Sequence, residues 1–263
     1  MADHPAPRRR ARAVAVVVLA LAAVLSAVAA AGGFSASPAT APTARSTDQQ
    51  PSVSGCRYRL RATNVRQGSG AGRRIALTFD DGPSAYTSRI LDVLESQDIP
   101  ATFFVVGRNV AGREELLSRM LSDGDMIGNH SYTHVDLSKA NSPALKQIDD
   151  TQAAIEAASG FTPCLARPPY GRTSKKLLGA LSRRHLTSTL WSVNPQDFLR
   201  PGTAQIKRRV LAGVRPGSII LDHDGGGDRS QTLAAIPEII QTLKARGYTF
   251  VTVTDLLGLG LKR

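Results

Sequence analysis

Histidines and carboxylates occur in short clusters in this sequence, at spacings that could bind a metal ion. His130-Ser-Tyr-Thr-His134 sets two imidazoles one helical turn apart, so that both could reach one cation from the same side. Asp80 and Asp81 follow an apolar run and precede Gly82-Pro83, a combination typical of a turn. One carboxylate could complete a His-His-carboxylate site that leaves a position for water, as in catalytic zinc centres. The alternatives are surface histidines and a turn that caps a helix.

Two further groups could move protons. If one aspartate binds the metal ion, the other can accept a proton from water as a general base, and spacing alone does not tell Asp80 from Asp81. His223 ends an apolar run, and strand periodicity places it on the same face as Leu221. An imidazole that titrates near neutrality can protonate a departing nitrogen, although a lone histidine is more often structural. We expect His185 to lie at the surface.

The segment Arg167-Pro-Pro-Tyr-Gly171 predicts a rigid loop, because two prolines restrict the backbone and exclude a helix. The guanidinium of Arg167 could hold a carboxylate through two nitrogens. The backbone N–H of Tyr170 could face a developing oxyanion. The alternative is a loop that only packs its tyrosine against the rim of the fold.

Apolar runs alternate with helical patterns after Arg74, which indicates β/α units around a parallel sheet. The predicted strands are 75–79, 101–106, 125–128, 164–166, 186–193, 218–221 and 249–253. The helical patterns include 88–95, 113–121, 144–158, 204–211 and 233–245. The polar clusters follow the strands, and in a barrel the loops at the carboxyl ends of the strands meet on one face. We therefore predict an α/β fold, a distorted (β/α) barrel of about seven parallel strands; an open doubly wound sheet is the alternative.

The order of these motifs resembles that of the polysaccharide deacetylase family, carbohydrate esterase family four. The matching motifs are Thr78-Phe-Asp-Asp-Gly-Pro83, His130-Ser-x-x-His134, Arg167-Pro-Pro-Tyr170 and Leu221-x-His223. The segments 101–104 and 225–229 match as well, so the resemblance covers about residues 75–257. It implies a distorted β/α barrel and hydrolysis of N-acetyl groups on an amino-sugar polymer such as peptidoglycan or a chitin-like oligomer.

The resemblance also implies a role for each motif residue. It implies that Asp80 is the general base, that Asp81, His130 and His134 bind a metal ion, usually zinc, and that His223 is the general acid. In the family pattern Arg167 steers Asp80, the Tyr170 N–H stabilises the oxyanion, Leu221 lines the pocket for the acetyl methyl group, and Asp197 tunes His223. Cobalt and other divalent ions also suit these ligands. The alternatives are an O-acetyl xylan esterase and a non-catalytic wall-binding module.

The fourth motif, from Trp191 to Phe198, departs from many relatives at two positions. It has Asn194 in place of an aspartate and Phe198 in place of a tryptophan, whereas Asp197 is kept. Phe198 offers substrate a smaller aromatic wall, so we expect the departure to affect substrate preference more than activity.

The N-terminal segment is typical of an export signal. Four arginines within residues 8–12 precede the uncharged run 13–31, which is long enough to approach a membrane span. Residues 32–54 have the composition of a flexible linker. We predict a cleaved signal peptide or a membrane anchor in 1–31, a linker in 32–54 and one catalytic domain in 55–263, located outside the cell, at the outer face of the membrane or in the wall.

Charge and cysteines agree with an exported protein. The net charge of +12 favours an anionic wall polymer or membrane surface rather than nucleic acid as a partner. The two cysteines, Cys56 and Cys164, are expected to form a disulfide in an oxidising compartment, the alternative being two separate thiols. We expect a monomer.

Overall fold

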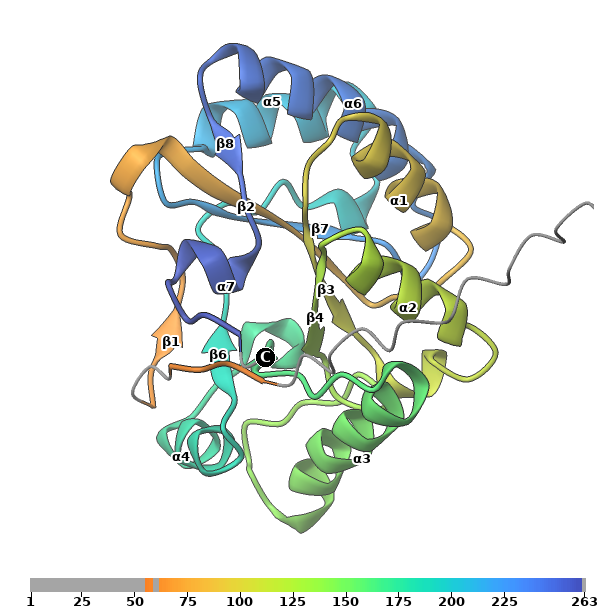
Figure 1. Cartoon of the computed structure of the whole chain (residues 1–263), viewed down its shortest axis with the longest axis vertical. Coiled ribbons are helices and arrows are strands. Elements are labelled where there is room, and N and C mark those ends of the chain that lie inside the picture. Colours follow the sequence, from red (N-terminus) through yellow and green to blue (C-terminus); the bar gives the residue numbers. More distant parts are fainter. Residues whose placement is uncertain (1–54, 59–61, 262–263) are drawn as a thin grey trace, which may run out of the picture. The chain divides into compact units, whose positions relative to one another are not determined.

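The computed structural model describes residues 55–58 and 62–261 (Figure 1). The predicted signal or anchor segment and the predicted linker lie outside the described residues. Among the helices of the described part, none combines the length and the apolar character that crossing a membrane requires.

The strands of the described part form a parallel sheet. They are β1 (Asn64–Val65), β2 (Arg74–Asp80), β3 (Thr102–Val105), β4 (Met126–Asn129), β5 (Leu165–Ala166), β6 (Thr187–Thr189), β7 (Ile219–His223) and β8 (Thr249–Phe250). Their order is β1-β6-β5-β4-β3-β2-β7, and β8 pairs with β2. β2 lies between β3 and β7, so the loops that follow these three strands are neighbours.

The sheet curves until its two ends meet. Beyond β6, Ser192 N–H donates to Ile219 O of β7 (3.0 Å), and Leu221 N–H donates to Val193 O (2.9 Å). An open doubly wound sheet would leave these edges unpaired. The predicted distorted (β/α) barrel is therefore confirmed.

Helices lie around the outside of the sheet (Figure 1). They are α1 (Thr87–Ser96), α2 (Glu114–Ser122), α3 (Ser142–Ser159), α4 (Lys175–Arg183), α5 (Thr203–Gly213), α6 (Ser230–Ala245) and α7 (Val253–Leu256). Local signals set their ends: Asn141 accepts a hydrogen bond from Ala144 N–H at the start of α3, and Gly160 ends that helix in a left-handed conformation. α3 buries Ile148, Thr151 and Ile155, whose spacing defines one helical face.

Some predicted boundaries were wrong. The predicted strand 249–253 ends at Phe250, because Thr252 caps α7 by accepting a hydrogen bond from Asp255 N–H (3.1 Å). The predicted strand 186–193 shortens to β6, although 192–193 still bond to β7 as described above. β1 was not predicted, since two residues are too short to show a periodic pattern.

The predicted disulfide between Cys56 and Cys164 is present. It joins the first described residues to the segment that leads into β5, and both cysteines are buried at the edge of the main core. In the outer layer of that core Phe79 of β2 stacks on Phe103 of β3, with ring centroids 5.2 Å apart. These contacts hold β2, from whose end Asp80 and Asp81 extend.

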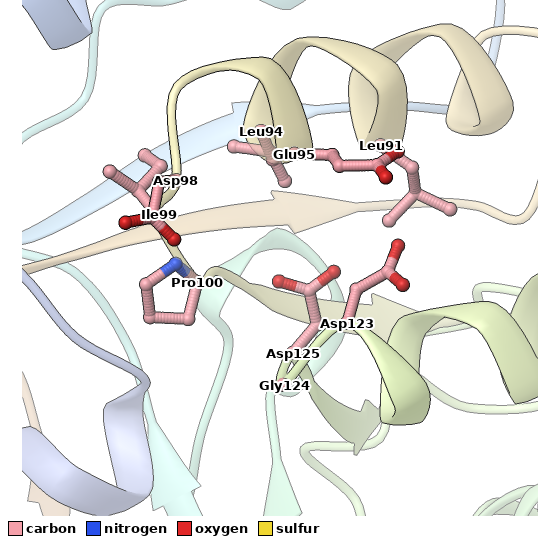
Figure 2. Close-up of a pocket in the computed structure, with 9 residues that line it drawn as sticks. All are labelled: Leu91, Leu94, Glu95, Asp98, Ile99, Pro100, Asp123, Gly124 and Asp125. Carbon is pink, nitrogen blue, oxygen red and sulfur yellow. The ribbon is translucent and has the colours of Figure 1, made fainter.

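A hollow of about 380 Å³ lies at the amino ends of β3 and β4, beneath α1 (Figure 2). Four carboxylates line it, those of Glu95, Asp98, Asp123 and Asp125. Arg119 pairs with Glu95 (2.9 Å) and Asp123 (3.2 Å). Asp125 Oδ1 accepts a hydrogen bond from Ala101 N–H (2.7 Å), and burial raises the pKa of Asp125 to about 7. This hollow is at the opposite strand ends from the motif residues.

Candidate active site

A second cavity, of about 390 Å³, lies at the carboxyl ends of the strands. It is lined by Asp80, Asp81, His130, His134, Pro168, Tyr170, Trp191, Asn194, Phe198, Leu221 and His223. All predicted site residues except Arg167 and Asp197 therefore line one cavity, and those two lie buried behind it. Residues from the carboxyl ends of five strands and the loops after them, far apart in the sequence, meet here because these strands run parallel.

Asp81, His130 and His134 form the group that could hold a metal ion. Their ligand atoms all lie within 4.8 Å of one another. Asp81 Oδ1 is 3.5 Å from His130 Nε2 and 3.3 Å from His134 Nε2. Asp81, directly after β2, has a φ of +76°, which turns its side chain towards the imidazoles. The other aspartate, Asp80, ends β2 and has a different set of contacts.

The two histidines do not lie on a helix, so the expected helical spacing was wrong. The segment from His130 to His134 follows β4 as an irregular loop, in which Ser131 and His134 have φ values of +64° and +62°. These left-handed residues fold the loop back, and the imidazole centroids come within 5.0 Å of each other. The Tyr170 hydroxyl supports the turn by donating to His134 O (3.2 Å).

The tautomer of His130 suits a metal ligand. Its Nδ1 lies 2.6 Å from Arg167 O, a hydrogen-bond acceptor, so Nδ1 carries the proton and Nε2 presents a lone pair to Asp81. Burial lowers the pKa of His130 to about 3, which keeps the ring neutral. A neutral imidazole whose second nitrogen is fixed by a carbonyl is the usual form of a histidine ligand.

One atom of this group lacks a partner that a cation would supply. Asp81 Oδ1 is buried and accepts no hydrogen bond from any described residue. An unsatisfied buried carboxylate oxygen is unfavourable, and here it faces two imidazole nitrogens. Two nitrogen ligands and one oxygen ligand around an open position match the donor set of a catalytic zinc site. The residues present therefore fit a divalent metal ion.

Asp80 lies beside this group and is held by Arg167. Nη1 of the fully buried Arg167 donates to Asp80 Oδ1 (2.7 Å) and to Thr78 Oγ1 (2.8 Å). The clasp through two nitrogens was a wrong expectation, because Nε donates instead to Thr189 O, at the end of β6, and Nη2 donates to Leu190 O. Burial raises the pKa of Asp80 above its ordinary value of 3.8, although the Arg167 guanidinium opposes the shift. Asp80 Oδ2 is 3.6 Å from His130 Nε2.

His223, at the end of β7, is fixed by Asp197. Asp197 Oδ1 lies 2.7 Å from His223 Nδ1, and Asp197 Oδ2 accepts the His223 backbone N–H (2.9 Å). Burial lowers the pKa of His223, but the hydrogen bond and charge of Asp197 outweigh it, so the pKa lies above the ordinary 6.5. Thr232 Oγ1, which sequence reasoning missed, donates to Asp197 Oδ2 (2.8 Å).

Apolar side chains form the rest of the cavity rim. Tyr170 and Phe198 line the cavity and are exposed, and the Phe198 ring packs edge-on to His223 at 5.6 Å. Leu221 lies in the wall between the strands and is buried. Trp191 also lines the cavity; it had no predicted role, although it is the single tryptophan of the chain and opens the fourth motif.

Comparisons with known proteins agree with the fold and the site. The polysaccharide deacetylase family model matches residues 67–188. A chitooligosaccharide deacetylase from a Bradyrhizobium species is 38% identical over 190 residues, which cover 67% of this chain and 87% of that protein. A solved peptidoglycan N-acetylglucosamine deacetylase is 32% identical, with a TM-score of 0.73 over 76% of this chain and 95% of that chain. A family-four pseudoenzyme from Bacillus anthracis is 28% identical, with a TM-score of 0.69 over 75% of this chain and 69% of that chain.

The fold, the motifs and these similarities define a class of carbohydrate-modifying hydrolase. The chain belongs to the polysaccharide deacetylase family, carbohydrate esterase family four, and is a hydrolase of that type.

Proposed function

We propose that this protein removes N-acetyl groups from an amino-sugar polymer outside the cell, releasing acetate and a free amine. The observation that carries the proposal is that a buried carboxylate, a possible metal site and a histidine with a raised pKa line one cavity. The relatives support it, since they are named as deacetylases of chitooligosaccharide and of peptidoglycan. The proposed substrate is an N-acetylated polymer of the cell-wall or chitin-like class.

Asp81, His130 and His134 would hold one divalent ion, zinc by the preference of this donor set. When bound, such an ion polarises the acetyl carbonyl and lowers the pKa of a water molecule. His130 is already in the tautomer that the role requires, because its other nitrogen is engaged by Arg167 O. Leu221 would contact the acetyl methyl group, and Phe198 a sugar ring.

The protein's own residues would carry the protons. Asp80 accepts a proton from the attacking water, whose oxygen forms a bond to the acetyl carbon. The Tyr170 backbone N–H stabilises the negative charge on the carbonyl oxygen. His223, kept protonated by Asp197, donates a proton to the sugar nitrogen as the C–N bond breaks. Arg167 holds the Asp80 carboxylate so that its second oxygen faces the cavity.

Replacing Asp80 with asparagine tests the general-base assignment. D80N keeps the shape of the side chain but cannot accept a proton, so we expect turnover to fall by about 10² to 10⁴-fold. Zinc binding should remain, because Asp80 is not in the proposed ligand set. Acetate release and bound zinc are measured on the same preparation. Full activity in a zinc-loaded D80N would falsify the role assigned to Asp80.

A substrate screen tests the reaction itself. The exported domain, 55–263, is assayed for acetate release from N-acetylglucosamine oligomers, from peptidoglycan and from acetylated xylan, with and without a chelator. We expect release from the N-acetylated polymers and loss of activity on chelation, reversed by zinc. Release from xylan alone would make the protein an O-acetyl esterase. Inactivity on every polymer, with zinc bound, would favour a non-catalytic wall-binding module.

The proposed location is outside the cell. The Cys56–Cys164 disulfide supports an oxidising compartment, and the sequence of residues 1–31 supports export. We propose that residues 1–31 act as a signal peptide or an anchor, that 32–54 act as a linker and that 55–263 form the catalytic domain, active as a monomer.

A further inference from the structure

The turn that carries Asp81 lies against the loop that follows β7. Gly82 N–H donates to Asp224 Oδ1 (3.0 Å), and Asp224 N–H donates to Asp80 O (3.0 Å). A Cβ atom at Gly225 would overlap the carbonyl oxygen of Asp81, so the two backbones are in direct contact. The loop after β7 therefore forms a wall behind Asp81.

Within this wall Gly226 contacts the Asp81 carboxylate itself. A Cβ atom on Gly226 would lie 2.6 Å from Asp81 Oδ2 and 3.2 Å from its Cγ. The 2.6 Å separation is too short for non-bonded atoms, so any side chain at 226 has to displace the carboxylate. The other oxygen, Oδ1, is the one that faces both imidazoles. Where Oδ2 rests therefore decides where Oδ1 points.

Asn109 holds the same turn from the loop after β3, the strand on the other side of β2. It ends the short 3-10 helix Gly107–Asn109 after β3, and its Nδ2 donates to Asp81 O (2.9 Å). The left-handed conformation of Asp81 is unfavourable for a residue with a side chain, so it requires contacts that hold it. Asn109 on one side of β2 and the backbone at Gly225 on the other side supply contacts to the Asp81 backbone, and Gly226 lies against its carboxylate.

We propose that Gly226 and Asn109 are positioning residues that set the metal affinity of the site by holding the Asp81 carboxylate towards His130 and His134. The inference rests on the metal-binding role proposed for Asp81 and adds what orients that ligand. The absence of a side chain at 226 leaves space for Oδ2, and the Asn109 amide fixes the carbonyl of the same residue.

A pair of glycine substitutions isolates this effect. Gly226 and Gly112 are both exposed and have nearly the same left-handed φ, +73° and +75°, so alanine strains the backbone alike at each. A Cβ atom on Gly112, however, would meet no described heavy atom within 4 Å. G226A and G112A are made in the full chain. The zinc dissociation constant is measured by competition with a chromogenic chelator, and the melting temperature is measured without metal.

We expect both variants to melt at similar temperatures without metal, and G226A alone to bind zinc about 10- to 100-fold more weakly, the usual effect of disturbing a residue that orients a metal ligand. A zinc dissociation constant for G226A within about threefold of that for G112A would overturn the inference. If the unchanged protein and G112A also bind no zinc, the proposed function fails as well.

The variant N109A tests the other contact without adding an atom. It removes the donor to Asp81 O, and we expect zinc binding about 10-fold weaker than in the unchanged protein, with catalytic residues untouched. If G226A does not fold, N109A decides alone. A zinc dissociation constant within about threefold of the unchanged protein then overturns the inference.

Discussion

At the scale of single residues, the cavity separates groups of one chemical type by their surroundings. Asp80 and Asp81 are adjacent in the sequence, yet Asp80 is paired with Arg167 and Asp81 faces the imidazoles of His130 and His134. His130 and His223 differ in the same way. Burial lowers the pKa of His130, whereas Asp197 raises the pKa of His223 above 6.5. The buried ring of His130 therefore suits a metal ligand, and the ring of His223, paired with Asp197, suits a proton donor.

The pairing of His223 with Asp197 predicts a pH effect. In D197N the imidazolium loses its charge partner while its burial remains, so we expect the pKa of His223 to fall below 6.5. The protonated fraction at neutral pH then decreases, and the alkaline limb of kcat/KM moves to lower pH. The measurement is acetate release across pH, with T232S as a control that keeps the hydroxyl donor to Asp197. An alkaline limb that does not move would mean that another group sets it.

At the scale of elements, short strands and tight loops position the site, and the disulfide holds the segment that leads into β5. Cys164 lies just before β5, and Arg167 directly follows β5. The guanidinium is nonetheless fixed by Thr78, by Asp80 and by carbonyls at the end of β6, so the disulfide supports the fold more than the chemistry.

Removing the disulfide should lower stability and spare activity. The bond joins cysteines 108 residues apart, and closing a loop of that length is worth about 5 kcal/mol in the chain-entropy model. We expect the double variant C56S/C164S to lose up to about that much unfolding free energy in urea and to keep its kcat at 25 °C. An unfolding free energy within about 1 kcal/mol of the unchanged protein would contradict this expectation.

The turn between α2 and β4 predicts a pH-dependent stability. Asp125 has a pKa of about 7 in the folded protein because it is buried, against an ordinary value of 3.8 (Figure 2). Because the pKa of Asp125 is raised in the folded state, its contribution to the free energy of unfolding is fully present below about pH 3.8. That contribution is lost as the pH rises through 7.

We therefore expect D125N, which keeps the acceptor for Ala101 N–H, to gain stability over the unchanged protein between pH 4 and 7, by at most about 1.4 kcal/mol per pH unit. Urea unfolding at several pH values measures the difference between the two proteins. D98N, at the exposed rim of the same hollow, is the control. A difference that does not change with pH would show that Asp125 is ionised without penalty.

At the scale of the whole molecule, the chain that forms this barrel is strongly basic. The net charge is +12, and leaving out residues 1–31, with four arginines and one aspartate, still leaves +9. A charge of this size attracts anionic polymers over a distance of about 8 Å at physiological salt.

This charge predicts salt-sensitive attachment to cell walls. We expect residues 55–263 to sediment with wall fragments that carry anionic polymers, less so in 0.5 M than in 0.05 M salt, because screening weakens the attraction. Fragments stripped of those polymers are the control. Attachment that is equal at both salt concentrations would point to recognition of the neutral sugar chain instead.

The sequence by itself determined the class of fold, the strands that carry the motifs and most of the residues that line the cavity. These follow from local patterns: apolar runs predict strands, and polar residues at their carboxyl ends share a face in a parallel barrel. The disulfide was also predictable, because export and a single pair of cysteines leave one pairing.

Only the tertiary structure decided which carboxylate faces the imidazoles, how His130 and His134 converge without a helix, and which residues stand behind them. Asn109 and Thr232 lie outside the matching motifs, and Gly226 lies in the matching segment 225–229, which by itself indicates no role for it. Their roles come from contacts such as that of Gly82 with Asp224, 142 residues apart in the chain. Sequence spacing carries no information about such contacts, because they depend on how neighbouring strands place their loops in space.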